Sequence, residues 1–292
     1  GPSAPSQNMV KCIYLTKIGG TPYHITLTWS KSVGGLGLSL YACEPHLKWP
    51  NNSMQSTMRP WILGKKKGKI ILPFGPSCEV VAFWDFSSAN YKGSSPEPVD
   101  GFFFALVYDH EIMLLLGNMP LEAYSKTQAT SCSSETNMIS RREHIFGRKV
   151  YSTKAQFGEN GRSHDILIEC NVRAREPRLS VTVDKQVVVH VKRLTWKFRG
   201  NQTFLVDGLS VELFWDVHNW LFSHNDGHAI FMFQCSTTPT NKSWSSSSTT
   251  TVTNTSYNPL SQWHHVSGGS SLSNHEAENW GFSLLLYAWK VE

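Results

Sequence analysis

Short apolar runs separated by turn residues follow one another along most of the chain. They are rich in β-branched and aromatic residues and often end at Gly-Gly or Gly-Thr-Pro, a pattern typical of β-strands. In the first part of the sequence, the predicted strands cover residues 12–18, 23–29, 36–42, 69–72, 79–86, 102–108 and 111–116.

One helix interrupts this series. Pro120 suits a first helical position and Glu122 complements the N-terminal dipole, which predicts a helix over residues 120–128. A polar loop is expected at residues 131–137. Strands then resume at residues 148–157, 165–170, 179–183, 186–191, 193–199, 202–206, 211–218, 228–235 and 281–291. Tight hairpin turns are predicted at Asp109-His110, Asp184-Lys185 and Asp207-Gly208.

Six short motifs occur twice in the same order. The clearest pair is Phe83-Trp84-Asp85 with Phe214-Trp215-Asp216. The other pairs match residues 14–17 with 151–154, 24–27 with 165–168, 61–68 with 196–200, 101–106 with 227–232, and 114–116 with 284–286. An ordered series of this kind predicts an ancient tandem duplication.

The predicted fold is therefore all-β, with two tandem antiparallel units and one short linking helix. The units are expected to be barrel- or sandwich-like and related by a pseudo-two-fold axis, and one large barrel of both halves is the alternative. Residues 1–9 are interpreted as a cleavage scar and disordered tail, 10–118 as the first unit, and 119–146 as the linking helix and loop. The second unit takes residues 147–235 plus 280–292, and residues 236–279 are expected to be a mostly disordered Ser/Thr-rich insertion.

Composition narrows the class of protein. The chain has 292 residues with 11 Trp, 15 Phe and 9 Tyr, and its net charge is +5. Such an aromatic content argues against disorder over most of the chain, and no heptad or glycine period indicates a coiled coil or collagen. Asp109, His110 and Glu111 interrupt the most apolar region, so no membrane span is expected. The 6 cysteines are widely spaced, which favours reduced thiols and a cytoplasmic or nuclear protein.

Several longer motifs are distinctive. They are residues 142–147, residues 191–204, residues 206–209, Phe214-Trp-Asp-Val-His-Asn-Trp-Leu-Phe222, and the ending at residues 282–289. Together they resemble the plant-specific family known as domain of unknown function eight hundred and sixty-eight, over nearly the whole chain. The resemblance implies a flowering-plant source and a mostly β fold, and it carries no catalytic residues. Residues 49–57 and 73–76 depart most from the family pattern, which leaves room for a specialised role.

Asp85 and Asp216 are candidate catalytic residues because they hold equivalent places after Phe-Trp. A pair of buried carboxylates could work as acid and base, with His218 as a third group that handles protons. The simpler interpretation is that each Asp ends a strand and caps the following turn.

The sequence contains no motif for a metal site, a phosphate-binding loop or a nucleophilic hydrolase. His218, His224, Asp226 and His228 are metal-ligand residue types, but no ligand spacing on one rigid element supports them, so no metal is expected. No phosphate-cradling glycine loop, GxSxG or paired Cys–His signature occurs. The sequence therefore predicts neither a cofactor nor a familiar nucleophilic hydrolase.

Residues 193–199 combine basic and aromatic side chains. In a strand, Leu194, Trp196 and Phe198 would face one way, opposite to the basic residues. Lys65, Lys66, Lys67 and Lys69 hold the matching place in the first half. Basic strands with aromatics can follow a nucleic-acid backbone, yet this alternation would put the aromatics in the core. Nucleic acid is therefore the less favoured partner.

The strand-borne aromatics are expected either to fill the interior or to line an apolar pocket. For a pocket, the predicted ligand-binding residues are Trp84 and Trp215. The leading hypothesis is a non-enzymatic binding module for an apolar small molecule or a protein partner. A pocket-shaping cyclase or isomerase of plant specialised metabolism is the first alternative, and nucleic-acid binding is the second. The sequence leaves open whether the chain is an enzyme and what its oligomeric state is.

Overall fold

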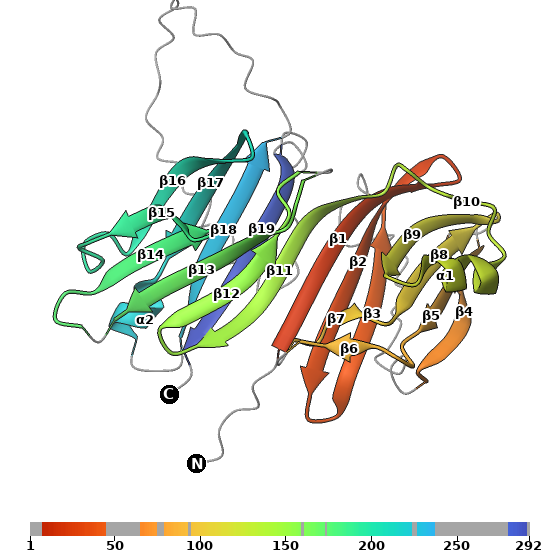
Figure 1. Cartoon of the computed structure of the whole chain (residues 1–292), viewed down its shortest axis with the longest axis horizontal. Helices are drawn as coiled ribbons and strands as arrows, with labels where there is room; N and C mark the ends of the chain where they lie inside the picture. The colour runs from red at the N-terminus through yellow and green to blue at the C-terminus, as the bar shows by residue number, and fades with distance from the viewer. Residues whose placement is uncertain are drawn as a thin grey trace, which may run out of the picture. The chain divides into compact units, whose positions relative to one another are not determined.

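The computed structural model describes residues 8–44, 65–74, 79–92, 95–158, 161–172, 174–223, 227–236 and 280–290. Figure 1 shows the strands and helices that these residues form. The chain divides into two compact units. Unit 1 comprises Gly1–Ile145 and Leu284–Tyr287, and unit 2 comprises Phe146–Ser283 and Ala288–Glu292.

Unit 1 is built from two sheets. The first has the order β11 (Asn137–Gly147), β1 (Asn8–Ile18), β2 (Thr21–Ser32) and β3 (Gly35–Cys43), with antiparallel neighbours. The second has the order β10 (Ser131–Cys132), β9 (Glu111–Gly117), β8 (Phe103–Tyr108), β5 (Glu79–Asp85) and β4 (Lys67–Pro73). Two short strands, β6 (Asn90–Tyr91) and β7 (Pro98–Asp100), pair with each other.

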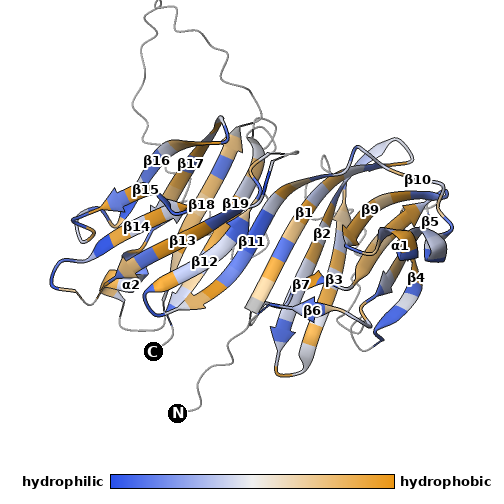
Figure 2. Ribbon diagram, viewed as in Figure 1, coloured by the Kyte–Doolittle hydropathy of each residue, from blue (hydrophilic) through white to orange (hydrophobic). Residues whose placement is uncertain are grey.

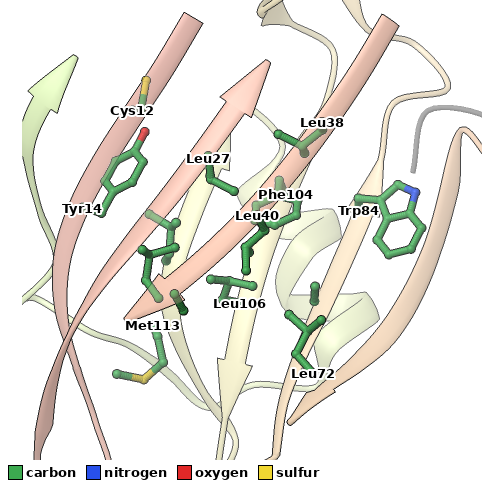
Figure 3. Packing of buried hydrophobic residues seen from close by; sticks show 14 of the residues in the cluster. Cys12, Tyr14, Leu27, Leu38, Leu40, Leu72, Trp84, Phe104, Leu106 and Met113 are labelled. Atoms are coloured by element: carbon green, nitrogen blue, oxygen red, sulfur yellow. The ribbon is translucent and has the colours of Figure 1, made fainter. Parts of the chain in front are cut away.

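The core of unit 1 lies between its two sheets. Figure 3 shows Leu27 and Leu40 from the first sheet beside Phe104 and Leu106 from the second, and all four are at most 1% exposed. Burial of one such side chain contributes about 1.5–3 kcal/mol. The two sheets therefore form a sandwich around an apolar layer.

The second sheet of unit 1 is buried on its other face as well. The helix α1 (Pro120–Thr127) places Ala123 in a second apolar cluster with Phe103, Ala105 and Ile112. Figure 2 shows the resulting hydrophobic character of β8, which has no alternation of polar and apolar residues. A strand covered on both faces needs a continuous apolar run, which explains residues 102–108.

Unit 2 also contains two sheets. One has the order β12 (Val150–Ala155), β13 (His164–Asn171), β14 (Arg178–Val183) and β15 (Gln186–Val191). The other strands lie in the order β16 (Arg199–Val206), β17 (Leu209–Asp216), β18 (His228–Ser236) and β19 (Trp280–Lys290), of which Leu284–Tyr287 are assigned to unit 1. The helix α2 (His218–Phe222) follows β17. Phe157, which follows β12, packs on Phe233 of β18 and Phe282 of β19, with ring centroids 6.2 and 6.3 Å apart. A second apolar layer therefore lies between these sheets.

The three predicted hairpin turns are confirmed. Asp109-His110, Asp184-Lys185 and Asp207-Gly208 each have positive φ at both residues, and each connects two paired antiparallel strands. Type I′ turns need this backbone conformation, and Asp and Gly adopt it most readily.

The structure confirms a mostly β chain and corrects several details. The described residues form several open sheets, so a closed barrel is wrong. Each sheet covers its apolar face with a second sheet, and closure is not needed for burial. The region expected to be only a helix and loop contains the long strand β11, and α2 is a second helix that the pattern did not predict. Residues 193–198 form a turn and not a strand, and only Arg199 of the predicted strand belongs to one, as the first residue of β16.

Two of the predicted segments lie almost entirely outside the residues that the structure describes. The expected disordered tail and insertion lie outside the described residues, except for residues 8, 9 and 236. No helix of the part that the structure describes is long and apolar enough to cross a membrane.

Candidate functional site

Residues 192–198, here called the tryptophan loop, connect β15 to β16 in unit 2. The backbone N–H groups of Trp196 and Lys197 both donate to the carbonyl oxygen of Arg193, at 3.1 and 3.0 Å. The side chain of Leu194 is completely buried, and its N–H donates to the carbonyl oxygen of Pro177 at 3.2 Å. One buried leucine and a tight turn therefore replace the predicted strand.

This turn changes where the aromatic side chains point. Trp196 is 84% exposed and shares the surface of the loop with the exposed Lys192, Arg193 and Lys197. The prediction that Trp196 faces the core is therefore wrong, because strand alternation does not apply within a turn. An exposed indole stands among cationic side chains.

Two hydrogen bonds from β17 and the residue after it hold the loop backbone. The Trp215 indole Nε1 donates to the carbonyl oxygen of Lys197 at 3.1 Å, and the Val217 N–H donates to that of Phe198 at 2.9 Å. Trp215 is 5% exposed and lies against Gly200, where a side chain would collide with the indole ring. Trp215, predicted to bind a ligand, is thus placed to shape the loop, and its role toward a ligand stays a prediction.

Asp216 links the loop to the start of α2. Its carboxylate accepts from Arg199 Nε at 2.8 Å and from the His218 N–H at 3.0 Å, and the residue is 5% exposed. Accepting from the backbone N–H two residues later is typical of an Asp that caps a turn. The geometry therefore agrees with the simpler interpretation of this candidate catalytic residue.

Three partly exposed rings contact one another, and Arg199 lies over one of them. Phe198 contacts His218 and Phe222 with centroid distances of 5.4 and 5.5 Å, and the Arg199 guanidinium carbon is 5.3 Å from the Phe198 ring centroid. His218 and Phe222 are four residues apart on α2 and therefore share one face of it. The candidate residue His218 thus belongs to an aromatic group next to the tryptophan loop.

Unit 1 repeats this anchoring around residues 65–69, here called the lysine segment. The Trp84 indole Nε1 donates to the carbonyl oxygen of Lys65 at 2.9 Å, and the Phe86 N–H donates to that of Lys66 at 2.6 Å. Asp85 accepts from the Ser87 N–H at 2.8 Å, so it caps a turn as Asp216 does. Trp84 is 3% exposed, and its predicted role in ligand binding also stays a prediction.

A histidine cluster that the sequence did not indicate connects the two sheets of unit 2. His164, at the start of β13, is 2% exposed and lies between the hairpin turns that contain Asp184 and Asp207. Its Nδ1 is 2.8 Å from Asp184 and its Nε2 is 3.1 Å from Asp207. His164 therefore bridges the two hairpin turns as a structural cross-link.

The bonds from the Asp165 N–H and from His164 hold the pKa of Asp184 below its ordinary value of 3.8. Arg162 adds to this effect, since it contacts Asp184 at 3.2 Å and Asp207 at 3.3 Å. The residues come from distant positions, so no local motif reveals the cluster.

A second unpredicted cluster lies in unit 1. Arg141 of β11 forms a two-pronged ion pair with Glu97, at 3.2 and 2.6 Å, and also contacts Glu143 and the Cys12 sulfur. Burial lowers the pKa of Arg141, but Glu143 and Glu97 raise it, and the net direction is upward. Burial raises the pKa of Cys12 to about 12, which makes its thiol a poor nucleophile.

Metal chemistry finds no support in the described part of the chain, where no group of three or more His, Cys, Asp or Glu could hold an ion. His224 and Asp226, which belong to the local cluster seen in the sequence, lie outside the described residues. His218 and His228 therefore carry no metal assignment.

The comparisons with known proteins concern nearly the whole chain. The model of the family described as plant protein of unknown function (DUF868) matches residues 5–290. Neither a curated protein nor a solved structure matches the chain.

Proposed function

The chain belongs to the plant protein family of unknown function DUF868, and we propose that this member is a non-catalytic module that binds single-stranded nucleic acid. The site is the tryptophan loop of unit 2. The observation that carries the proposal is the indole of Trp196, 84% exposed among Lys192, Arg193 and Lys197. It reverses the order of the hypotheses drawn from the sequence, because the aromatic side chain is exposed on the same loop as the basic ones and is not buried in the core.

Stacking and charge together favour a nucleic-acid strand. Every base offers a flat face to an exposed aromatic ring, and the phosphates attract lysine and arginine. Arg175 and Arg178 add exposed cations near the loop, because Pro177 between them accepts the Leu194 N–H at 3.2 Å. Glu176 is the acidic residue of that turn, and it pairs with Arg178 at 3.2 Å.

The shape of the loop favours a single strand over a duplex or a membrane. Reading a duplex groove needs a helix or ribbon that enters it, and the loop presents only a turn. Insertion into a lipid surface needs an extended apolar face, whereas Trp196 is the one large apolar side chain exposed on this loop. Stacking of a single base requires only one exposed aromatic ring, and Trp196 supplies it.

The loop backbone is held before any ligand arrives. Leu194, Trp215 and Val217 fix three of its positions from the folded body of unit 2. A preorganised loop loses less conformational entropy on binding, so a small contact area can still bind. Nuclear or cytoplasmic location, expected from the cysteines, suits such a ligand.

We also infer that the two units derive from one duplicated ancestor. The Trp–Asp motifs end equivalent strands, and each indole and the N–H two residues later bind the carbonyls of consecutive basic-segment residues. Gly68 and Gly200 lie opposite Trp84 and Trp215 in the strand registers. These matches support the duplication, and the pseudo-two-fold relation of the units remains a prediction.

Fluorescence anisotropy with labelled oligo-U and oligo-dT of about 12 nucleotides tests the nucleic-acid proposal. We expect Trp196→Ala to weaken binding by about 5- to 150-fold, because one stacked base contributes about 1–3 kcal/mol. Trp196→Phe keeps a ring and should retain most of the affinity. The RNA and DNA arms show which strand is preferred.

Charge variants complete the test. Lys197→Ala should reduce the dependence of log affinity on log salt by about 0.7, the value for one phosphate contact on a single strand. Lys185→Asn removes a charge at the far end of the six-residue strand β15 and should change nothing, because Asn tolerates the positive φ of that turn. Wild-type affinity in Trp196→Ala would refute the proposal. Equal binding to polyglutamate or anionic vesicles, unaffected by Trp196→Ala, would also refute it.

A further inference from the structure

The lysine segment of unit 1 is a dense patch of one charge. Lys65, Lys66, Lys67 and Lys69 are all exposed, and Gly68 is the one residue among them without a charge. The segment lies at the start of β4, which is the edge strand of its sheet. Lys67 stands opposite Asp85 in the register, whereas Lys69 stands opposite Phe83.

The backbone beneath these lysines is fixed. Trp84 Nε1 and the Phe86 N–H bind the carbonyls of Lys65 and Lys66 at 2.9 and 2.6 Å. Gly68 lies opposite Trp84 in the strand pair, and a Cβ at Gly68 would approach the indole within 2.9 Å. A buried ring therefore takes the space inside the segment, while the lysine side chains point to solvent.

We propose that the lysine segment is a second contact for nucleic acid, one that binds phosphate groups only. The inference rests on the proposed function of the tryptophan loop and adds a separate site in the other unit. Both segments share the same Trp anchoring, but residues 65–69 themselves contain no aromatic side chain. Lysine ammonium groups without a stacking ring attract phosphates and do not read bases.

The salt dependence of binding distinguishes phosphate contacts at the lysine segment from base stacking at the tryptophan loop. Phosphate contacts release counterions, so each one adds about 0.7 to the slope of log affinity against log salt for single strands. The triple variant Lys65→Ala/Lys66→Ala/Lys69→Ala should therefore lower this slope by about 2 and weaken binding roughly tenfold or more at low salt. Its preference among base sequences should stay that of the wild type, because no base contact is removed.

Matched variants make the test specific. Lys31→Ala/Lys92→Ala/Lys126→Ala removes the same number of exposed charges from unit 1 outside the segment and should leave the slope close to that of the wild type. The triple Lys→Arg variant of the segment should restore binding, since arginine keeps the charge. All these changes affect exposed side chains, and the melting temperature confirms that each variant is folded.

The outcomes separate the two proposals. A lower slope in the segment variant, with the control variant unchanged, supports the phosphate contact. An unchanged slope overturns this inference while leaving the tryptophan loop intact. An equal drop in the control variant also overturns it, because the effect then reflects net charge alone. If Trp196→Ala has no effect but the segment variant lowers the slope, the stacking proposal fails and the phosphate contact stands.

Discussion

The indole nitrogen of Trp215 donates a hydrogen bond of 3.1 Å to the carbonyl oxygen of Lys197. One partner is a core residue at 5% exposure, and the other carries an exposed charge. This bond connects the sandwich of unit 2 to the backbone of its basic surface. Trp84 and Lys65 have the same relationship in unit 1, at 2.9 Å. In each unit, a core tryptophan thus supports a cationic segment.

Trp215→Phe should loosen the tryptophan loop. The substitution keeps an aromatic ring in the core but removes the donor to Lys197, which should cost about 1–3 kcal/mol of stability when a partly buried carbonyl loses its partner. Hydrogen exchange should accelerate at the Val217 amide, which binds Phe198 in the same loop. Exchange at wild-type rate would show that the indole bond does not hold the loop.

The two glycines beneath the indoles should differ in their tolerance of a side chain. A Cβ at Gly200 would lie 2.3 Å from the Trp215 ring, whereas one at Gly68 would lie 2.9 Å from Trp84. Gly200→Ala should therefore destabilise the chain by about 1–3 kcal/mol, the usual range for overpacking, and Gly68→Ala by less. Thermal unfolding of both, with Gly34→Ala as an uncrowded control, measures this order. The reverse order would mean that Trp215 has room to move.

Acid should weaken unit 2 through Asp184. The fold lowers the pKa of this carboxyl below 3.8, because the Asp165 N–H and His164 bind its ionised form. Its contribution to stability is therefore complete above the unfolded-state pKa and is lost as the pH falls through the folded pKa. Melting temperatures from about pH 6 to about pH 2 should fall more steeply for the wild type than for Asp184→Asn. Parallel curves would contradict this coupling.

Removing one of the two carboxylates that pair with Arg141 should lower the unfolding free energy less than removing both. Glu97→Gln leaves Glu143 beside the guanidinium, so we expect a loss of about 1–3 kcal/mol in unfolding free energy. Glu97→Gln/Glu143→Gln leaves a largely buried cation without an ionised partner and should lose about 3–5 kcal/mol. Urea unfolding of the single and double variants tests this. Equal losses would show that Glu143 does not share the charge.

Local chemistry by itself determined the turns, the apolar strands and the mostly β class. Asp109-His110, Asp184-Lys185 and Asp207-Gly208 were predictable because two adjacent residues set the backbone of a tight hairpin. The Trp–Asp motifs were visible as a repeat, and their capping role followed from the residue type.

Tertiary structure alone decided the basic surface and the polar clusters. Residues 193–199 alternate like a strand, but burial of Leu194, its hydrogen bond to the Pro177 carbonyl, and the bonds from Trp215 and Val217 turn the chain and expose Trp196. The polar sequence around Arg141 predicted a loop, but these residues form the strand β11. There, the charge of Arg141 is neutralised by Glu97, which is distant in the sequence. His164 likewise depends on Asp207, which belongs to another sheet. Each of these features depends on partners far apart in sequence, and no local pattern records such partners.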